Sequence, residues 1–229
     1  TMTSFAAVRT KFFDDFFVDA TAAGLRQFVI LAAGLDTRAW RLAALAGSSV
    51  YEIDQPGVLA FKAGVLEAPD AIEYRAVPID LREDWPTALR SAGLDVQQPT
   101  GWSIEGLLPY LPPDAQTALF GSVIGLSAPG SRVVVDAYRP EFYAESTLEH
   151  SFAQMDKAAR VDGDDDRIYS KDLFFTGDRP DVVEWLNAQD WSTSSVPSVT
   201  AMAECGRPAA PTVRADSLSS DFVTATAAG

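Results

Sequence analysis

The stretch FVILAAGLDTRAWRL, residues 28–42, carries the clearest fold signal in the chain. Its first six residues, 28–33, are apolar without alternation, which is typical of a strand buried on both faces of a parallel sheet. Gly34 then turns the chain, and Asp36 or Thr37 can cap the helix that follows. A buried strand, a glycine turn and a helix in succession indicate the opening unit of an α/β sheet.

Strands and helices alternate on both sides of this unit. An amphipathic helix is predicted over residues 5–20, where six apolar side chains recur at helical spacing. Further strands are expected at 49–53, 74–79, 101–104 and 132–138, with helices at 55–66 and 113–126. The pattern predicts an α/β fold with a Rossmann-like, doubly wound and mostly parallel sheet.

The alternation ends after residue 138. Residues 139–180 mix helical and polar stretches, and we interpret them as an insertion that forms a lid over the active edge of the sheet. The remainder is predicted to close the fold with a helix at 182–188 and two strands at 191–199 and 222–225. A loop rich in Pro, Ala and Ser is expected at 201–220. We expect one domain, 1–229, with a cofactor-binding half (1–138), the insertion, a closing part (181–229) and seven strands.

The composition narrows the function classes. The 229 residues carry 18 basic and 32 acidic side chains, a net charge of −14, which argues against a nucleic acid or an anionic membrane as partner. No apolar run approaches the ~18 residues of a membrane span, and no signal peptide is recognisable. One cysteine, Cys205, excludes an internal disulfide, and one histidine, His150, excludes a His-rich metal cluster. We predict a soluble, cytoplasmic protein without a metal site.

Acidic residues stand at the carboxyl ends of three predicted strands: Asp54, Asp80 and Glu105. Open α/β sheets bind ligands beyond these ends. Twenty residues separate Gly34 from Asp54, the distance at which an acid on the second strand meets a ribose hydroxyl in nucleoside-binding sheets. A carboxylate suits this role because it accepts hydrogen bonds from both hydroxyls. A solvated acid at a strand end is the alternative for Asp54.

The glycine pattern restricts the nucleoside ligand. A pyrophosphate is held by Gly-x-Gly-x-x-Gly, whereas residues 32–37 contain one glycine and an aspartate, Asp36, that would repel a phosphate. The turn therefore favours a ligand with a ribose and no phosphates. S-adenosylmethionine fits this description, and NAD does not.

Residues 28–42 closely resemble the first motif of the leucine carboxyl methyltransferase-like proteins, above all the mycobacterial and actinobacterial branch of S-adenosylmethionine-dependent methyltransferases. Further matches are AVRT (7–10) before FFDDF (12–16), YEIDQP (51–56), DLR (80–82) before DWP (84–86), EGLL (105–108) before YLP (110–112), and LSAPGS (126–131). The resemblance spans about residues 5–138 and implies the class I methyltransferase fold. Family members usually carry a longer amino-terminal helical region, which helps cover the cofactor.

The resemblance implies roles at the methionine part of the cofactor. Arg9 would pair with its carboxylate through a charge-assisted contact. Ala33 and Gly34 would let the backbone pass close to the methionine and ribose. Glu105 would lie near the amino group and the site of methyl transfer. A surface arginine on a helix is the alternative for Arg9, and a helix cap or a supporting acid is the alternative for Glu105.

The resemblance also implies roles at the nucleoside part. Asp54 would hold the ribose hydroxyls. Asp80 and the backbone of Leu81 would bind the adenine edge, with the Asp80 carboxylate accepting from the exocyclic amine.

Methyl transfer asks little of side chains, because a sulfonium methyl group is already electrophilic and the enzyme supplies alignment and exclusion of water. A carboxylate acceptor, which the resemblance suggests, is ionised at neutral pH and needs no general base. An alcohol or amine would need one, and Tyr110 or Glu105 could serve near the transfer site; we assign no base. We predict O-methylation of a carboxylate on an unidentified acceptor. The alternative is a non-catalytic adenosyl-ligand-binding protein, and the oligomeric state stays open.

Two other stretches of the sequence resemble known motifs but do not match them. Residues 101–106 are one residue too long for the Gly-x-Ser-x-Gly elbow of hydrolases. Asp162, Asp164 and Asp166 match the start of a calcium loop, but Arg167 replaces its glycine and Leu173 its terminal glutamate. A solvated acidic loop is the expected structure there.

Overall fold

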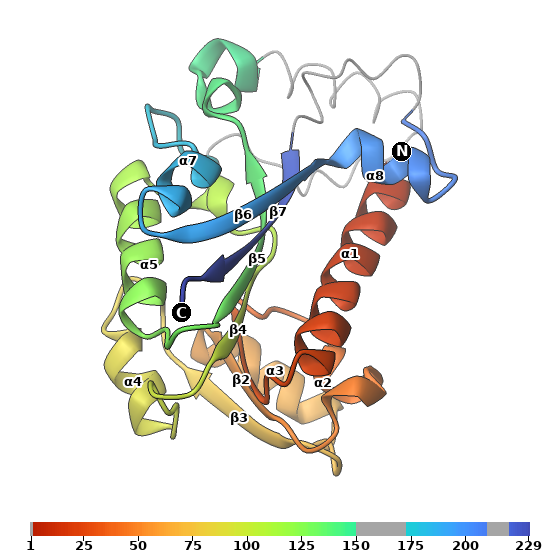
Figure 1. The fold of residues 1–229 in the computed structure, drawn as a ribbon, viewed down its shortest axis with the longest axis vertical. Helices are drawn as coiled ribbons and strands as arrows, with labels where there is room; N and C mark the ends of the chain where they lie inside the picture. Colours follow the sequence, from red (N-terminus) through yellow and green to blue (C-terminus); the bar gives the residue numbers. More distant parts are fainter. Residues whose placement is uncertain (1, 150–172, 210–219) are drawn as a thin grey trace.

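The computed structural model describes residues 2–149, 173–209 and 220–229, which form one seven-stranded sheet flanked by helices (Figure 1). The strands lie in the order β3-β2-β1-β4-β5-β7-β6. Their bounds are β1 Gln27–Leu31, β2 Ser49–Asp54, β3 Glu73–Pro78, β4 Thr100–Ile104, β5 Arg132–Tyr138, β6 Trp191–Pro197 and β7 Ser220–Ala227. Neighbours among β1–β5 are parallel, and β7 is antiparallel to both β5 and β6. The predicted mostly parallel, seven-stranded sheet is confirmed.

Helices cover both faces of the sheet (Figure 1). One face carries α1 (Met2–Ala22), α2 (Arg38–Arg41) and the 3-10 turn η1 (Ala43–Leu45), together with α3 (Pro56–Val65). The other face carries α4 (Trp85–Ser91), α5 (Pro113–Gly125) and α7 (Val182–Asn187). On the first face the Lys62 Nζ of α3 contacts the buried Glu52 Oε2 of β2 at 2.6 Å.

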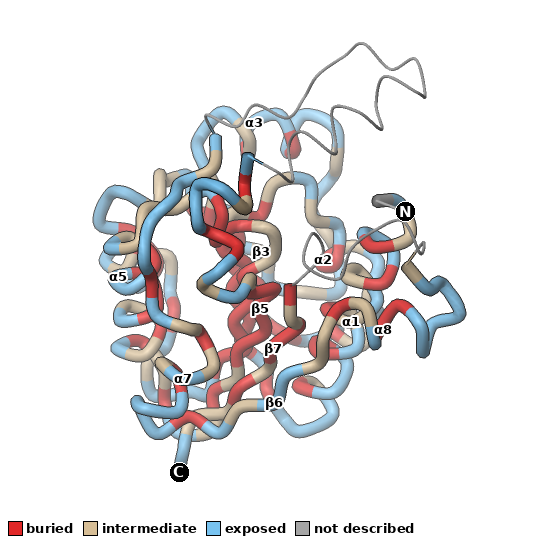
Figure 2. The backbone as a smooth tube through the Cα atoms, turned by 90° about the horizontal axis from the view of Figure 1, so that it is seen from above, coloured by how far each residue is buried: buried red, intermediate tan, exposed pale blue. Residues whose placement is uncertain are grey.

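The core is split by the sheet into two clusters, because alternate residues of a strand point to opposite faces. In β1, Val29 and Leu31 face the α4–α5–α7 side, whereas Phe28 and Ile30 face α1. All five residues of β1 are buried, as expected for a strand covered on both faces. Figure 2 shows this burial concentrated in the strands and exposure on the outer helices.

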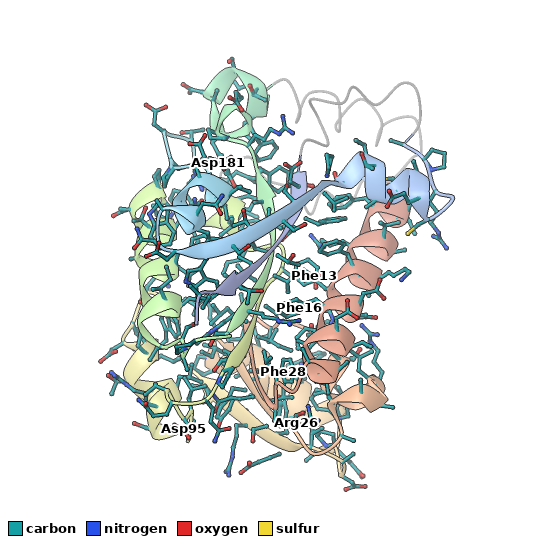
Figure 3. All side chains as sticks on the ribbon, viewed as in Figure 1. Phe13, Phe16, Arg26, Phe28, Asp95 and Asp181 are labelled. Atoms are coloured by element: carbon teal, nitrogen blue, oxygen red, sulfur yellow. The ribbon has the colours of Figure 1, made fainter. Side chains whose placement is uncertain are left out.

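Aromatic side chains attach α1 to the sheet. Phe13 and Phe16 project from the helix toward the strands, where Phe28 lies (Figure 3). The rings of Phe17 and Phe28 are 5.2 Å apart. The Phe28 ring also covers Gly101 of β4, where an added Cβ would lie 2.5 Å from a ring carbon. A glycine at 101 therefore lets β1 and β4 pair closely under α1.

The first unit is shorter than predicted. The strand expected at 28–33 ends at Leu31, because Ala32 adopts the left-handed conformation with φ of 52°. The following helix is a single turn, 38–41, and its start is held by Asp36, whose Oδ1 accepts from the Arg38 N–H at 2.6 Å. Helix α4, which the sequence analysis did not predict, begins after Asp84, whose side chain accepts from the Thr87 N–H.

The carboxyl-terminal part needs a correction. The strand expected at 191–199 ends at Pro197, and helix α8 (Ser198–Glu204) occupies the start of the predicted loop at 201–220. It forms because Ala201 and Met202 pack with Phe5 and Val8 of α1 in a small apolar cluster. The acidic run at 162–166 and His150 lie outside the described residues. In the described ranges, no helix combines the length and apolar character needed to cross a membrane.

Candidate cofactor-binding site

A cavity of about 350 Å³ opens at the carboxyl edge of the sheet, within the size range of small-molecule sites. Its lining comes from α1, the end of β1, the turn after β1, α2 and the loop after β4. Arg9, Ala33 and Glu105, three of the predicted site residues, lie in this lining. The fold therefore gathers residues from distant parts of the sequence around one cavity.

The turn after β1 is shaped by its backbone. Ala32 and Gly34 both have positive φ, 52° and 51°. A left-handed alanine is uncommon, and such conformations concentrate at functional sites. The turn places the Gly34 N–H against Asp54 Oδ2 at 2.7 Å, while the Gln55 N–H donates to Oδ1 at 2.7 Å. Gly34 and Asp54, which the sequence analysis assigned to one ribose site, are thus joined by a direct hydrogen bond.

Asp80 is linked to Asp54 through Gln55, which donates hydrogen bonds to both carboxylates. Gln55 Nε2 donates to Asp80 Oδ2 at 3.3 Å, which links the ends of β2 and β3. The Arg82 side chain and N–H both donate to Asp80 and lower its pKa to about 2. Leu81 packs against the core from the adjacent position. We call Asp54, Asp80 and Leu81 the acidic end; none of the three belongs to the described lining of the cavity.

The other end consists of ion pairs. Arg9 Nε donates to Glu105 Oε1 and Arg9 Nη1 to Asp136 Oδ2, both at 3.0 Å. Asp136 Oδ1 accepts from the Gly106 N–H at 2.6 Å. Gly106 has φ of 64°, and an added Cβ would lie 3.3 Å from Arg9 Nη1. The structure therefore brings the predicted Arg9 and Glu105 into direct contact.

Two residues of this end were not predicted. Asp136 of β5 is fully buried, and burial raises its pKa to about 6 although Arg9 and the Gly106 N–H oppose the shift. Arg38 is 3% exposed and pairs with Asp14, Asp36 and Glu105. Burial acts to lower the Arg38 pKa, but these carboxylates outweigh it and raise the pKa. We call Arg9, Arg38, Glu105 and Asp136 the ion-pair end.

Signals for both residues exist in the sequence. Asp136 interrupts the apolar run of a strand that is otherwise buried, Val133 to Ala137. A charge at such a position must find a partner in the fold. Arg38 lies inside the stretch 28–42, but its three partners come from segments up to 67 residues away, so its role depends on tertiary contacts.

Tyr110 lies in the 3-10 turn η2 (Leu108–Tyr110), is 42% exposed and does not belong to the described lining of the cavity. Its ring lies 5.1 Å from that of Phe174. The Phe175 N–H donates to the Pro109 carbonyl at 3.0 Å, and Arg179 Nη1 donates to the Leu108 carbonyl at 3.1 Å. The described end of the predicted insertion therefore packs on the loop that follows Glu105.

Residues 1–124 match the family model described as leucine carboxyl methyltransferase. The chain belongs to this family. A relative from Mycobacterium avium is 48% identical over 220 residues, which cover 93% of the chain and 70% of the relative. One from Mycolicibacterium smegmatis is 49% identical over 215 residues, covering 90% of the chain and 67% of the relative. Both relatives are provisionally named S-adenosyl-L-methionine-dependent methyltransferases.

Solved structures confirm the fold of this leucine carboxyl methyltransferase family member. A provisionally named methyltransferase from Thermobifida fusca aligns with a TM-score of 0.63 at 18% identity, covering 99% of this chain and 81% of that one. A protein from Streptomyces avermitilis aligns with a TM-score of 0.57 at 18% identity, covering 93% and 81%. The predicted family and class I methyltransferase fold are thus confirmed. Within the described residues, no three His, Cys, Asp or Glu side chains are grouped to hold a metal ion.

Proposed function

We propose that the protein transfers a methyl group from S-adenosylmethionine to a carboxylate oxygen of a small molecule or of another acceptor's carboxyl group. The observation that carries the proposal is the cavity at the carboxyl edge, lined by Arg9 and Glu105, in a member of the leucine carboxyl methyltransferase family. The names of the mycobacterial relatives support the choice of methyl donor.

The residues present fit this methyl donor. Its amino-acid part is a zwitterion and needs a cation and an anion side by side, which Arg9 and Glu105 offer with nitrogen and oxygen 3.0 Å apart. Its ribose needs an acceptor, and Asp54 is held beside the Gly34 turn. Asp80 offers a carboxylate for the adenine amine, one strand further along the sheet. The turn has no pyrophosphate cradle, so a dinucleotide fits less well.

Bound S-adenosylmethionine supplies an electrophilic methyl group: the acceptor oxygen bonds to the methyl carbon while the carbon–sulfur bond breaks, and its electron pair stays on the sulfur of S-adenosylhomocysteine. The chain's part is to orient the donor through Arg9, Asp54 and Glu105. Exclusion of water from around the reacting atoms would favour the transfer.

A carboxylate acceptor agrees with the charges around the site. Both oxygens of Glu105 are engaged by guanidinium groups, so this carboxylate serves ion pairing rather than contact with an acceptor hydroxyl. Burial raises the pKa of Tyr138 and Tyr143, so neither phenol supplies a phenolate at neutral pH. An acceptor that is already ionised needs no base, and a carboxylate meets this condition.

The net charge of −14 also favours a small acceptor over a nucleic acid, because an acidic surface repels polyphosphates. The single cysteine, which is exposed and free, suits the reducing conditions of the cytoplasm. We therefore place the reaction there, without a membrane partner.

The test is methyl transfer from S-adenosylmethionine labelled on its methyl group to panels of carboxylic acids, alcohols and amines. The proposal expects label in the carboxylic acid panel, released by mild alkali because methyl esters hydrolyse, and loss of transfer with Asp54→Ala. Alkali-stable label in the other panels would contradict the carboxylate assignment. Cofactor binding without transfer to any panel would favour a non-catalytic adenosyl-ligand-binding protein.

A further inference from the structure

Arg38, the first residue of α2, is a buried guanidinium that the proposed reaction does not yet use. Its Nε donates to Asp14 Oδ1 of α1 at 2.8 Å. Its Nη1 contacts the Asp36 carboxylate and lies 2.8 Å from Glu105 Oε2. One side chain therefore joins α1, the turn after β1 and the loop after β4.

The two oxygens of Glu105 have different partners. Oε1 accepts from Arg9 Nε at 3.0 Å, and Oε2 faces Arg38 Nη1 at 2.8 Å. A bound amino-acid zwitterion needs Glu105 for its ammonium group and Arg9 for its carboxylate. Both new contacts fall on the Arg9–Glu105 pair, and we expect the two side chains to separate as these contacts form. The Arg38–Glu105 contact competes with neither of them.

We propose that Arg38 is a positioning residue for the amino-acid end of the methyl donor, a role that rests on the proposed function. It keeps the Glu105 carboxylate oriented while Arg9 exchanges Glu105 for the carboxylate of the ligand. Asp14 and Asp36 hold the guanidinium in place from two further sides.

The surroundings of Arg38 suit a fixed countercharge. Its guanidinium carbon lies 5.5 Å from the centre of the Phe13 ring and 5.8 Å from that of Phe17. Aromatic faces and three carboxylates leave little freedom for the group, and a buried cation with several partners is costly to move. Arg9, with fewer partners, is the one of the two that can change its contact.

A purely structural role would have another signature. Arg38 also ties α1 to the sheet, so its loss could loosen the whole site. S-adenosylhomocysteine and 5′-methylthioadenosine separate the two roles, because they share the adenosine and the sulfur and differ in the amino-acid part. A positioning role affects the first ligand alone, whereas a structural role affects both.

The experiment is calorimetric titration of both ligands into the full chain and the variant Arg38→Met. We expect the affinity for S-adenosylhomocysteine to fall about tenfold or more, as for the loss of support to a charged hydrogen bond, with 5′-methylthioadenosine changed less than about twofold. Arg38→Lys retains the charge but not the fork of donors, and should recover part of the loss. The matched control is Arg75→Met, which removes a guanidinium from the exposed pair with Glu73 and should change neither affinity.

Equal losses for the two ligands would assign Arg38 a structural role and overturn the proposal, as would unchanged affinities for both. If Arg38→Met does not fold, the same comparison is made with Arg38→Lys and decides by the same criteria. Failure of the unmodified chain to bind S-adenosylhomocysteine would refute the proposed function itself, and this role with it. Binding by the unmodified chain with no selective loss would refute only the role of Arg38.

Discussion

At the ion-pair end of the proposed site, Arg9 contacts both Glu105 and Asp136, and every charge faces a partner from another element. At the acidic end, Asp54 and Asp80 are held mainly by neighbours in their own strand ends and by the Gly34 turn. The first arrangement rearranges to admit a charged ligand group, whereas at the second Asp54 accepts one hydrogen bond on each oxygen and keeps a further lone pair on both. The proposed site thus combines ion pairs that change partners when the ligand binds with a carboxylate, Asp54, that is already in place for the nucleoside.

The largest effect that separates the two ends is expected for Arg9→Met. The ligand carboxylate would lose its cation, and the affinity for S-adenosylhomocysteine should fall roughly 100-fold, as for the loss of two hydrogen bonds to charged groups. The affinity for 5′-methylthioadenosine should stay unchanged, because that ligand has no carboxylate. Calorimetry of both ligands measures the difference. Lys11→Met, which removes an exposed cation from the same helix, serves as the control.

Equal losses for both ligands with Arg9→Met would mean that Arg9 holds α1 in place and does not bind the ligand. The expected difference between the two ends would then be absent, because Arg9 would not contact the ligand.

Asp54→Ala tests the acidic end in the opposite way. The ribose is common to both ligands, so the two affinities should fall by the same factor, about 30-fold, as for about 2 kcal/mol of lost hydrogen bonding. Asp54→Asn retains one acceptor oxygen and should lose less. A loss confined to S-adenosylhomocysteine would place Asp54 at the amino-acid part and contradict the ribose assignment.

The two ends also differ in their response to pH. The folded-state pKa of Asp136, about 6, exceeds its ordinary value near 3.8, so the folded protein binds this proton more tightly. The resulting stability is present below pH 4 and is lost as the pH rises through 6. Relative to Asp136→Asn, the free energy of unfolding should fall by about 2 kcal/mol between pH 4 and 7. Urea denaturation at several pH values measures this change, and parallel pH profiles for the two proteins would contradict it.

Asp80 is expected to make the smallest contribution to stability, and this contribution changes with pH in the opposite direction to that of Asp136. Its pKa is lowered to about 2 by Arg82, so its contribution is present above pH 4 and is lost as the pH falls through 2. The Asp80 side chain and the Arg82 guanidinium meet at the surface, where water screens them, so Asp80→Asn should scarcely change stability at neutral pH. An NMR titration of the Asp80 carboxyl carbon tests the direction; a midpoint above 4 would contradict it.

The acidic end was predictable from sequence because it depends on local order. A strand that is buried on both faces, one glycine and an acid twenty residues later are enough to place Asp54 beside Gly34 once parallel strands align. The same reasoning placed Asp80 and Glu105 at strand ends. The strand order was not predicted, because alternating strands and helices limit the possible arrangements without selecting one of them.

The ion-pair end was predictable only in part. Arg9 and Glu105 were expected to serve one ligand, but nothing local indicated that they bind each other or that Asp136 joins them. Those contacts depend on how α1 crosses the sheet, which is set by the packing of Phe13 and other apolar residues in the core. Helix α8 was missed for a similar reason, because it is only seven residues long and is stabilised by contact with α1.

This cavity and the adjoining strand ends are proposed to bind an adenosyl amino acid. The most direct measurement is calorimetric titration of the chain with S-adenosylmethionine, S-adenosylhomocysteine and NAD in parallel. We predict binding of the first two at micromolar concentrations and none of NAD. Binding of NAD alone would contradict the claim and assign the Gly34 turn to a dinucleotide.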